Sequence, residues 1–191
     1  MQNNQHTVIL LVGKTGSGKS SLINKLCERH NYKQLISHTT RPRRSENDND
    51  HVFVTKDDYF KAKQNGDIVA ETEIAGNYYY ATRDQLYQSD LYTIDPIGLE
   101  SLMSMDLPDI HFVTVYISCP DNLREIRAVG KRGDDKQIYR ERNLAERNQF
   151  RRFIADEQWD YSIKNLSFAK SCCILRRICE IEGVWQNHQN N

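Results

Sequence analysis

The chain lacks an excess of charge of either sign, because 26 Lys and Arg residues balance 26 Asp and Glu residues in 191. Domains that bind generic polyanions usually carry a basic excess, so the balance argues against nucleic-acid binding. The longest strongly apolar stretch, Val8–Val12, is far shorter than the roughly 20 residues that cross a bilayer. Residues 1–5 also lack the charged and apolar regions of a signal peptide. We expect one cytoplasmic domain with no membrane partner.

Paired cysteines and linkers are also missing. The five cysteines form an odd set without a Cys-x-x-Cys pair, which indicates neither a disulfide scaffold nor a zinc site. They are predicted to be reduced core residues: Cys27, Cys119, Cys172, Cys173 and Cys179. No repeat, low-complexity tract or Pro/Gly/Ser linker divides the chain, and only the polar tail 186–191 is predicted to be disordered.

Short apolar runs recur at intervals that mostly leave room for a crossover helix. This alternation predicts an α/β fold with a parallel sheet flanked by helices. The runs are Val8–Val12, Gln34–Ser37, Tyr92–Asp95, Phe112–Ser118 and Tyr161–Ile163. Near the end of the chain, Phe168, Cys172, Leu175 and Cys179 recur at steps of four, three and four, which predicts one face of a helix.

A different pattern lies between the second and third runs. His51–Val54 is predicted to be a strand, and residues 55–64 can form a helix after it. Ile68–Ala75 and Tyr78–Thr82 flank Gly76-Asn77, a pair that favours a tight hairpin turn. We expect a small β-rich insert attached to the parallel sheet.

The strongest motif is Gly13-Lys-Thr-Gly-Ser-Gly-Lys-Ser20, which fits the P-loop (Walker A) pattern G-x-x-x-x-G-K-[ST] and directly follows an apolar run. Its glycines let backbone N–H groups converge on phosphate oxygens, and the following helix N-terminus adds a positive dipole end. Lys19 is predicted to reach the outer phosphates and Ser20 to hold Mg²⁺. A glycine-rich turn that binds nothing would not require both residues. The predicted ATP contacts here are Gly13, Thr15, Gly16, Ser17, Gly18, Lys19, Ser20 and Ser21.

The basic segment after the second apolar run indicates which family of P-loop proteins the chain resembles. Together with the P-loop, Ser37-His-Thr-Thr-Arg-Pro-Arg-Arg44 closely resembles the guanylate kinases, and the resemblance extends over roughly residues 7–165. It implies that Ser37, Arg41 and Arg44 bind the nucleoside monophosphate. Arg suits such a role because its fork binds phosphate bidentately. The alternative is a solvated basic turn around Pro42.

The hairpin departs from the family pattern and can be aligned in two ways. By spacing, Glu71 and Thr82 match the family's guanine-reading glutamate and hydroxyl residue, with Tyr80 as its phosphate-binding tyrosine. Matching Gly76-Asn-Tyr-Tyr79 instead puts Ala70 and Ala81 at the two base-reading positions. We prefer the first alignment because it needs no insertion and keeps both hydrogen-bonding side chains.

Two further departures fall on the acceptor side. His51 stands where the family usually has another phosphate-binding tyrosine, and Thr93 stands where it usually has an acid two residues before Asp95. The resemblance assigns His51 and Asp95 to the acceptor site, and Asp95 also to catalysis.

The segment 122–152 resembles the family's lid. It holds ten Lys and Arg against five Asp and Glu, and the resemblance implies that Arg127, Arg132 and Arg142 approach the phosphates. Cations delivered by a closing lid stabilise a transferring phosphoryl group and exclude water. Asn165 resembles an asparagine near the adenine of ATP, although a helix-cap role is an alternative.

The resemblance implies transfer of the γ-phosphoryl group of MgATP to GMP or dGMP by a monomer or homodimer. Lys19, Arg41, Asp95, Arg132 and Arg142 are the expected catalytic residues. The expected parts are a core (6–37, 91–121 and 153–185), a monophosphate-binding insert (38–90) and a helical lid (122–152). Alternatives are a similar kinase with another nucleotide or a phosphorylated sugar as acceptor, and a non-catalytic binding module.

Overall fold

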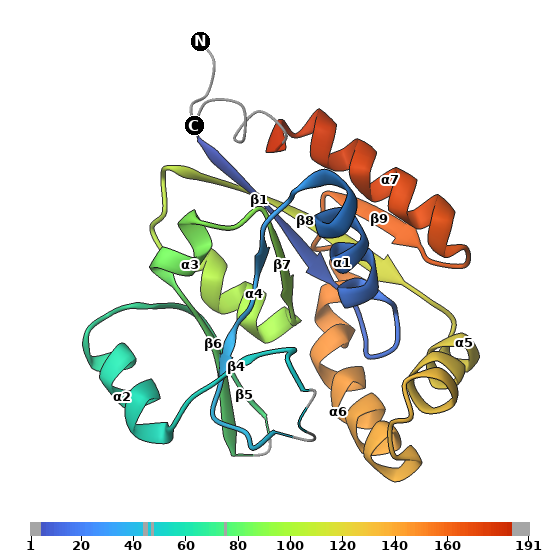
Figure 1. The fold of residues 1–191 in the computed structure, drawn as a ribbon, viewed down its shortest axis with the longest axis horizontal. Helices are drawn as coiled ribbons and strands as arrows, with labels where there is room; N and C mark the ends of the chain where they lie inside the picture. Colours follow the sequence, from blue (N-terminus) through green and yellow to red (C-terminus); the bar gives the residue numbers. More distant parts are fainter. Residues whose placement is uncertain (1–4, 44–45, 47, 75, 185–191) are drawn as a thin grey trace.

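The computed structural model describes residues 5–43, 46, 48–74 and 76–184 as two sheets with surrounding helices (Figure 1). In chain order the elements are β1 (His6–Val12), α1 (Lys19–His30), β2 (Gln34–Leu35), β3 (His38–Thr39), β4 (Val52–Phe53), α2 (Lys56–Gln64), β5 (Ile68–Ile74), β6 (Asn77–Thr82), α3 (Arg83–Tyr87), β7 (Leu91–Ile94), α4 (Pro96–Met103), β8 (Ile110–Ser118), α5 (Asp121–Glu125), the π-helix η1 (Ile126–Lys131), α6 (Lys136–Ala155), β9 (Tyr161–Lys164) and α7 (Phe168–Ile181). Arg44 and the tail 186–191 lie outside the described residues.

The larger sheet has the strand order β2-β7-β1-β8-β9, and every neighbouring pair in it is parallel. Because β1 lies in the middle, it is buried on both faces, which explains its unbroken run of apolar residues. This confirms the α/β prediction. The second run is shorter than predicted, since β2 ends at Leu35 and the chain then enters the other sheet as β3.

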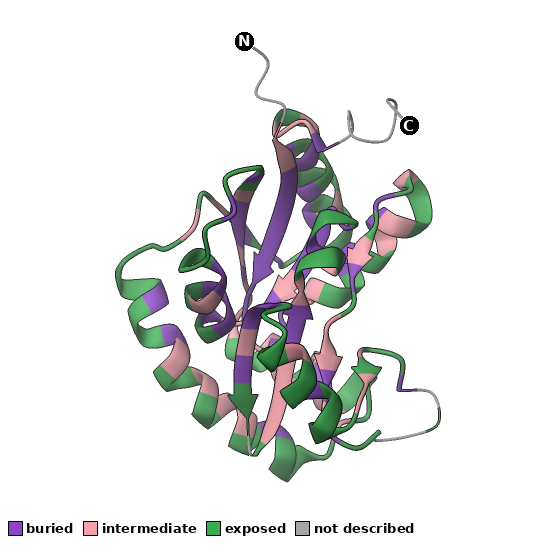
Figure 2. Ribbon diagram, turned by 90° about the vertical axis from the view of Figure 1, so that its left-hand side faces the viewer, coloured by how far each residue is buried: buried purple, intermediate pink, exposed green. Residues whose placement is uncertain are grey.

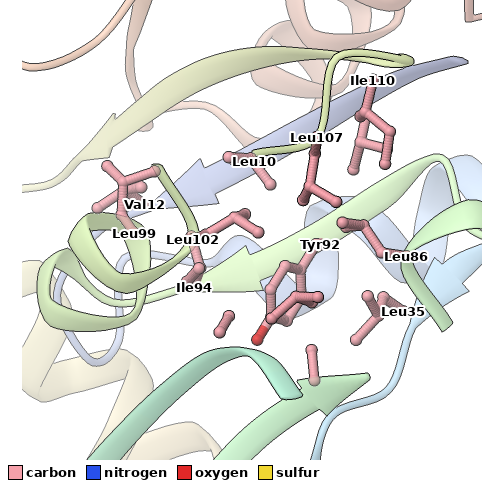
Figure 3. Packing of buried hydrophobic residues seen from close by; sticks show 14 of the residues in the cluster. Leu10, Val12, Leu35, Leu86, Tyr92, Ile94, Leu99, Leu102, Leu107 and Ile110 are labelled. Atoms are coloured by element: carbon pink, nitrogen blue, oxygen red, sulfur yellow. The ribbon is translucent and has the colours of Figure 1, made fainter. Parts of the chain in front are cut away.

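The strands of the central sheet are largely buried (Figure 2), and buried apolar residues form one cluster on each of its faces. On one face, Leu10 and Val12 of β1 pack with Leu99 and Leu102 of α4, as Figure 3 shows, and α6 adds its aromatic residues there. On the other face, Ile9 and Leu11 of β1 pack with residues of α1 and α7. Because successive side chains of a strand point to opposite faces, the side chains of β1 contribute to both clusters.

The smaller sheet, ordered β4-β3-β6-β5, confirms the β-rich insert. Its hairpin pairs β5 with β6 in antiparallel register, with an irregularity between Ile68 and Ala70. Helix α2 starts as predicted, because Thr55 and Asp58 form a reciprocal capping box. Ala75, at the hairpin turn, lies outside the described residues.

The cysteine prediction is only partly correct. Cys179 is buried, but Cys173 is exposed and the other three are half-buried. The predicted α7 face is also incomplete, because Phe168 at the start of the helix is 42% exposed. Among the helices in the described ranges, none has the length and hydropathy that a bilayer-spanning segment needs.

Candidate functional site

The P-loop connects β1 to α1 at the carboxyl edge of the larger sheet (Figure 1). Gly16 and Gly18 have φ values of 78° and 99°, in the left-handed region that favours glycine. A Cβ atom at Gly16 would lie 2.5 Å from the backbone oxygen of Arg124, so this position also needs glycine for close approach. Lys19 begins α1, and the next two residues, Ser20 and Ser21, are exposed.

Lys19 lies over the loop and donates a hydrogen bond to the backbone oxygen of Gly13. Burial lowers its pKa, and the carboxylates of Glu146 and Asp95 oppose that shift. Arg132 and Arg124 contribute to the lowering. The lysine is thus within electrostatic range of groups from three other parts of the chain.

Glu146 of α6 contacts the P-loop at Thr15. We did not predict this contact from the sequence. Its two carboxylate oxygens accept the backbone N–H of Thr15 at 2.8 and 3.0 Å, and one also accepts the Thr15 hydroxyl at 2.6 Å. The Thr15 N–H donates to a carboxylate oxygen in this structure, so it is suited to donate to a phosphate oxygen. The residues are 131 positions apart, so no local motif could reveal the pair.

Arg124 is a second residue that contacts the P-loop without any sequence motif pointing to it. It is 1% exposed and donates to the backbone oxygen of Thr15 at 3.0 Å. Its other nitrogen donates to Asp121 at 2.8 Å and to Asn143 at 2.7 Å. The guanidinium therefore ties α5 and α6 to the P-loop.

Asn165 and Arg127 hold the other side of the loop. Asn165 Nδ2 donates to the backbone oxygen of Ser17 at 2.8 Å, and Arg127 donates to the same oxygen at 3.4 Å. Asn165 is not a helix cap, because the N-cap position of α7 belongs to Ser167. The buried Ser17 Oγ and Asn165 Oδ1 have no hydrogen-bond partner within the described part of the chain.

The other two predicted lid arginines lie apart from these contacts. Arg132 forms a two-point ion pair with Asp134, and its side chain is 52% exposed. Arg142 is half-buried on α6. The π-helix η1 separates α5 from the turn before α6 and contains Gly130; such π-helical segments are frequent at functional sites.

On the acceptor side, Arg41 is 7% exposed and forms a bidentate pair with Asp48 at 2.6 and 3.2 Å. Burial acts to lower the Arg41 pKa, but Asp48 outweighs it and raises that pKa. Ser37 Oγ lies 3.0 Å from His51 Nδ1, and the His51 ring meets Tyr79 edge-on at 5.3 Å. Burial, followed by the charge of Arg41, lowers the pKa of His51.

Of these residues, Ser37, His51 and Tyr79 line a pocket of about 80 Å³ between the two sheets, and Arg41 and Asp48 do not line it. Its lining includes Ser37, His51, Thr72, Tyr79, Tyr92 and Asp95. Asp95 caps α4, because Oδ1 accepts the N–H groups of Ile97 and Gly98 at 2.9 and 3.0 Å. The same oxygen accepts the Thr72 hydroxyl at 3.1 Å.

The structure does not place the hairpin side chains as our preferred alignment expected. Glu71 reaches toward α2, where it accepts from Tyr59 at 2.9 Å and from Lys63 at 2.8 Å. Tyr80 is buried on the same face, with its ring 5.5 Å from the ring of Tyr59. Thr82 is the N-cap of α3. Neither Tyr80 nor Thr82 lines the acceptor pocket, and Glu71 lines it but has both carboxylate oxygens bonded to residues of α2.

The opposite face of the hairpin lines the pocket. Ala70 and Ala81 form a register pair, and Tyr79 and Thr72 lie on the same face of their strands as these alanines. Both candidate base-reading pairs are eleven positions apart, so spacing could not distinguish them. The geometry agrees with the alternative alignment, with alanine at both positions.

Comparisons with known proteins agree with this architecture. Residues 5–182 match the family model for guanylate kinase. The chain is 30% identical over 143 residues to the guanylate kinase of Anaplasma phagocytophilum (strain HZ), covering 69% of this chain and 67% of that protein. It is 29% identical over 183 residues to that of Chlamydia felis, covering 92% and 86%. It is also 27% identical over 193 residues to that of Escherichia coli K12, covering 97% and 92%.

Structural similarity extends over nearly the whole chain. A crystal structure of the Anaplasma phagocytophilum guanylate kinase matches with a TM-score of 0.62 at 21% identity, covering 94% of this chain and 87% of that one. At this identity the match shows a common fold. Together with the family model over residues 5–182, it establishes that the chain belongs to the guanylate kinase family.

Proposed function

We propose that the protein is an ATP-dependent nucleoside monophosphate kinase. The observation that carries the proposal is the shared position of Asp95, whose charge acts on the P-loop Lys19 and whose side chain lines the acceptor pocket. Asp95 would therefore lie between the proposed triphosphate site and the proposed monophosphate site. An acceptor phosphate oxygen can then attack the γ-phosphorus of ATP in line, the bond to the β-phosphate oxygen breaks, and ADP leaves.

Each part of the chain would have a limited role in this transfer. The P-loop and Lys19 would hold the triphosphate, Ser20 would hold Mg²⁺ together with phosphate oxygens, and Arg41 would bind the acceptor phosphate. The buried Ser17 Oγ, which has no hydrogen-bond partner among the described residues, and the Thr15 N–H, which donates to a carboxylate, fit a bound polyphosphate. Within the described residues there is no cluster of three His, Cys, Asp or Glu side chains, which fits Mg²⁺ bound chiefly through substrate phosphates. Movement of Arg127, Arg132 and Arg142 with the α5–α6 segment would complete charge neutralisation.

Membership of the guanylate kinase family makes GMP and dGMP the first candidate acceptors. A second candidate acceptor, another monophosphate, is favoured by Ala70 and Ala81, which stand on the pocket face of the hairpin in place of hydrogen-bonding side chains. A non-catalytic binding module is less consistent with a complete Gly18-Lys19-Ser20 sequence.

The test is to incubate the protein with MgATP and each common monophosphate, and to identify the product by mass and by coupled ADP release. We expect a nucleoside diphosphate and stoichiometric ADP with at least one acceptor. ADP release that is independent of every acceptor would indicate an ATPase and contradict the proposal.

A further inference from the structure

The buried guanidinium of Arg124 has more hydrogen-bonding capacity than its contacts use. Of its N–H groups, three donate to the Thr15 backbone oxygen, Asp121 and Asn143. Its Nε has no hydrogen-bond partner among the described residues, and the side chain is 1% exposed. A buried donor without an acceptor costs free energy, so this guanidinium is suited to receive a further anionic group.

Glu146 lies just beyond hydrogen-bond reach of the same guanidinium. Its Oε2 is 3.9 Å from Arg124 Nη1, about 1 Å more than a charge-assisted hydrogen bond. Both carboxylate oxygens bond Thr15 instead. The Glu146 side chain is 17% exposed, so water can solvate its charge only in part. The free protein therefore keeps this carboxylate on the P-loop, with an arginine beside it.

Of the two partners, Arg124 is the one fixed to the P-loop. Its side chain donates to the backbone oxygen of Thr15 at 3.0 Å. Its own backbone oxygen packs against Gly16, where a Cβ atom would lie only 2.5 Å from it. Glu146 reaches the loop from α6 through its side chain. A change at this contact would therefore move Glu146 relative to Arg124.

A triphosphate on the P-loop competes with Glu146 for the Thr15 N–H. A displaced carboxylate that remains partly buried without a partner is costly. Arg124 can receive it after a movement of about 1 Å, with N–H groups that the present contacts leave unused. The exchange leaves the carboxylate paired and frees the loop for phosphate.

We propose that Arg124 is a positioning residue for ATP, which holds the P-loop at Thr15 and receives the Glu146 carboxylate when a triphosphate displaces it. The exchange replaces a contact between α6 and the loop by one between α6 and α5. The segment that carries the predicted lid arginines thus stays joined while nucleotide enters. This inference rests on the proposed function and adds to it the residue that makes Glu146 displaceable.

The test is calorimetric binding of MgATP to four proteins, which are the wild type, Arg124→Gln, Glu146→Gln and the double variant. Loss of a positive charge near the phosphates weakens ATP binding in both backgrounds, so the difference between the backgrounds is the decisive quantity. Arg124→Gln is expected to raise the Kd for ATP about 10-fold in the wild-type background. In the Glu146→Gln background the same change should raise it only about twofold, because no carboxylate needs a new partner.

Arg151→Gln is the matched control, because it removes the same charge from an exposed position of α6. It should leave the Kd for ATP nearly unchanged. Thermal unfolding of every variant checks the fold. If Arg124→Gln does not fold, Arg124→Lys takes its place in the comparison, because it keeps the buried charge but cannot reproduce the fork of the guanidinium. The same direction of difference is then expected.

Equal effects of Arg124→Gln in the two backgrounds would show that Arg124 only supports the loop structure, and would overturn the inference. Tighter ATP binding by Arg124→Gln would overturn it as well, since the arginine would then stabilise Glu146 on the loop. So would a wild-type protein that does not bind ATP. The kinase proposal is judged separately by product formation. The expected binding difference without any product would refute the kinase and leave this inference standing, and product with equal effects would do the reverse.

Discussion

At the scale of single residues, two donors of the candidate site, the Arg41 guanidinium and the Thr15 backbone N–H, already bond carboxylates within the protein. Arg41 binds Asp48, and Thr15 binds Glu146, each with the geometry that a phosphate would use. Nucleotide binding must therefore exchange an internal carboxylate for a phosphate. Such exchanges cost less than exposing a bare charge, because each donor keeps an anionic partner.

Lys19→Ala is expected to reduce phosphoryl transfer by about 10³-fold, equivalent to about 4 kcal/mol of transition-state stabilisation. The fold should survive, because the ammonium group contacts the loop and not the apolar core. Turnover and thermal unfolding measured on the same preparation check both statements. Lys25→Ala, at a half-buried position of α1 where the lysine pairs with Glu28, is the control and should retain full activity. Near-normal turnover of a folded Lys19→Ala protein would contradict the site.

His51 should make acceptor affinity depend on pH. Burial and Arg41 hold its pKa below the ordinary value of 6.5, so the ring is mainly neutral at pH 7 in the free protein. A bound phosphate dianion favours the protonated ring and raises its pKa, so acceptor binding and protonation support each other. The His51 contribution to binding should therefore be present at low pH and decline as the pH rises toward 7.

The measurement is acceptor KM from about pH 5.5 to 7.5 in the wild type and in His51→Tyr. The acceptor's second phosphate pKa, near 6, affects both proteins alike and cancels in their KM ratio. We expect the ratio of wild-type to variant KM to rise with pH. A constant ratio would place His51 outside the phosphate contact.

At the scale of elements, Glu146 of α6 joins the segment expected to be the lid to the P-loop. Glu146 lies on the same helix as Asn143, which accepts from Arg124, so the helix, α5 and the loop are joined as a unit. Binding of a triphosphate must displace Glu146 from the Thr15 N–H. The α6 helix would then respond to ATP through this contact.

Glu146→Gln should strengthen ATP binding several-fold, because the neutral amide competes less well for the Thr15 N–H and does not repel phosphate. Calorimetric titration with ATP measures the effect. Glu141→Gln is the matched control, since Glu141 is exposed on the same helix and contacts Gln137. Weaker ATP binding in Glu146→Gln would show instead that the carboxylate supports the nucleotide-binding shape of the loop.

At the scale of the whole molecule, an aromatic cluster anchors α6 to the central sheet. Phe153 is 1% exposed, and its ring lies 5.5 Å from Tyr116, 5.8 Å from Phe150 and 5.3 Å from Trp159. These contacts unite β8, α6 and the turn before β9 in a single core layer. The free energy of unfolding should therefore depend strongly on this ring.

Phe153→Ala is expected to lower the free energy of unfolding by about 3–5 kcal/mol. Denaturant unfolding followed by circular dichroism and by tryptophan fluorescence measures it, and coincident transitions would show loss of the whole fold. Ile154→Ala, at the adjacent, 39% exposed position, should cost much less. Equal costs at the two positions would contradict the anchoring role.

Sequence alone determined the features that depend on short-range pattern. The P-loop is contiguous, so residue types at fixed spacing were sufficient to predict its strand, turn and helix. The buried runs of β1 and β8 predicted a parallel sheet, and the Gly76-Asn77 pair predicted the hairpin. The family followed from these motifs and from Ser37–Arg44.

Only the tertiary structure decided which side chains enter the site. Glu71 with Thr82 and Ala70 with Ala81 have the same spacing, and a shift of one residue reverses the face of a strand. Glu146 and Arg124 join the P-loop from more than 100 residues away, through the packing of α5 and α6. Short-range spacing carries no information on such contacts, because they depend on how the sheets and helices pack together.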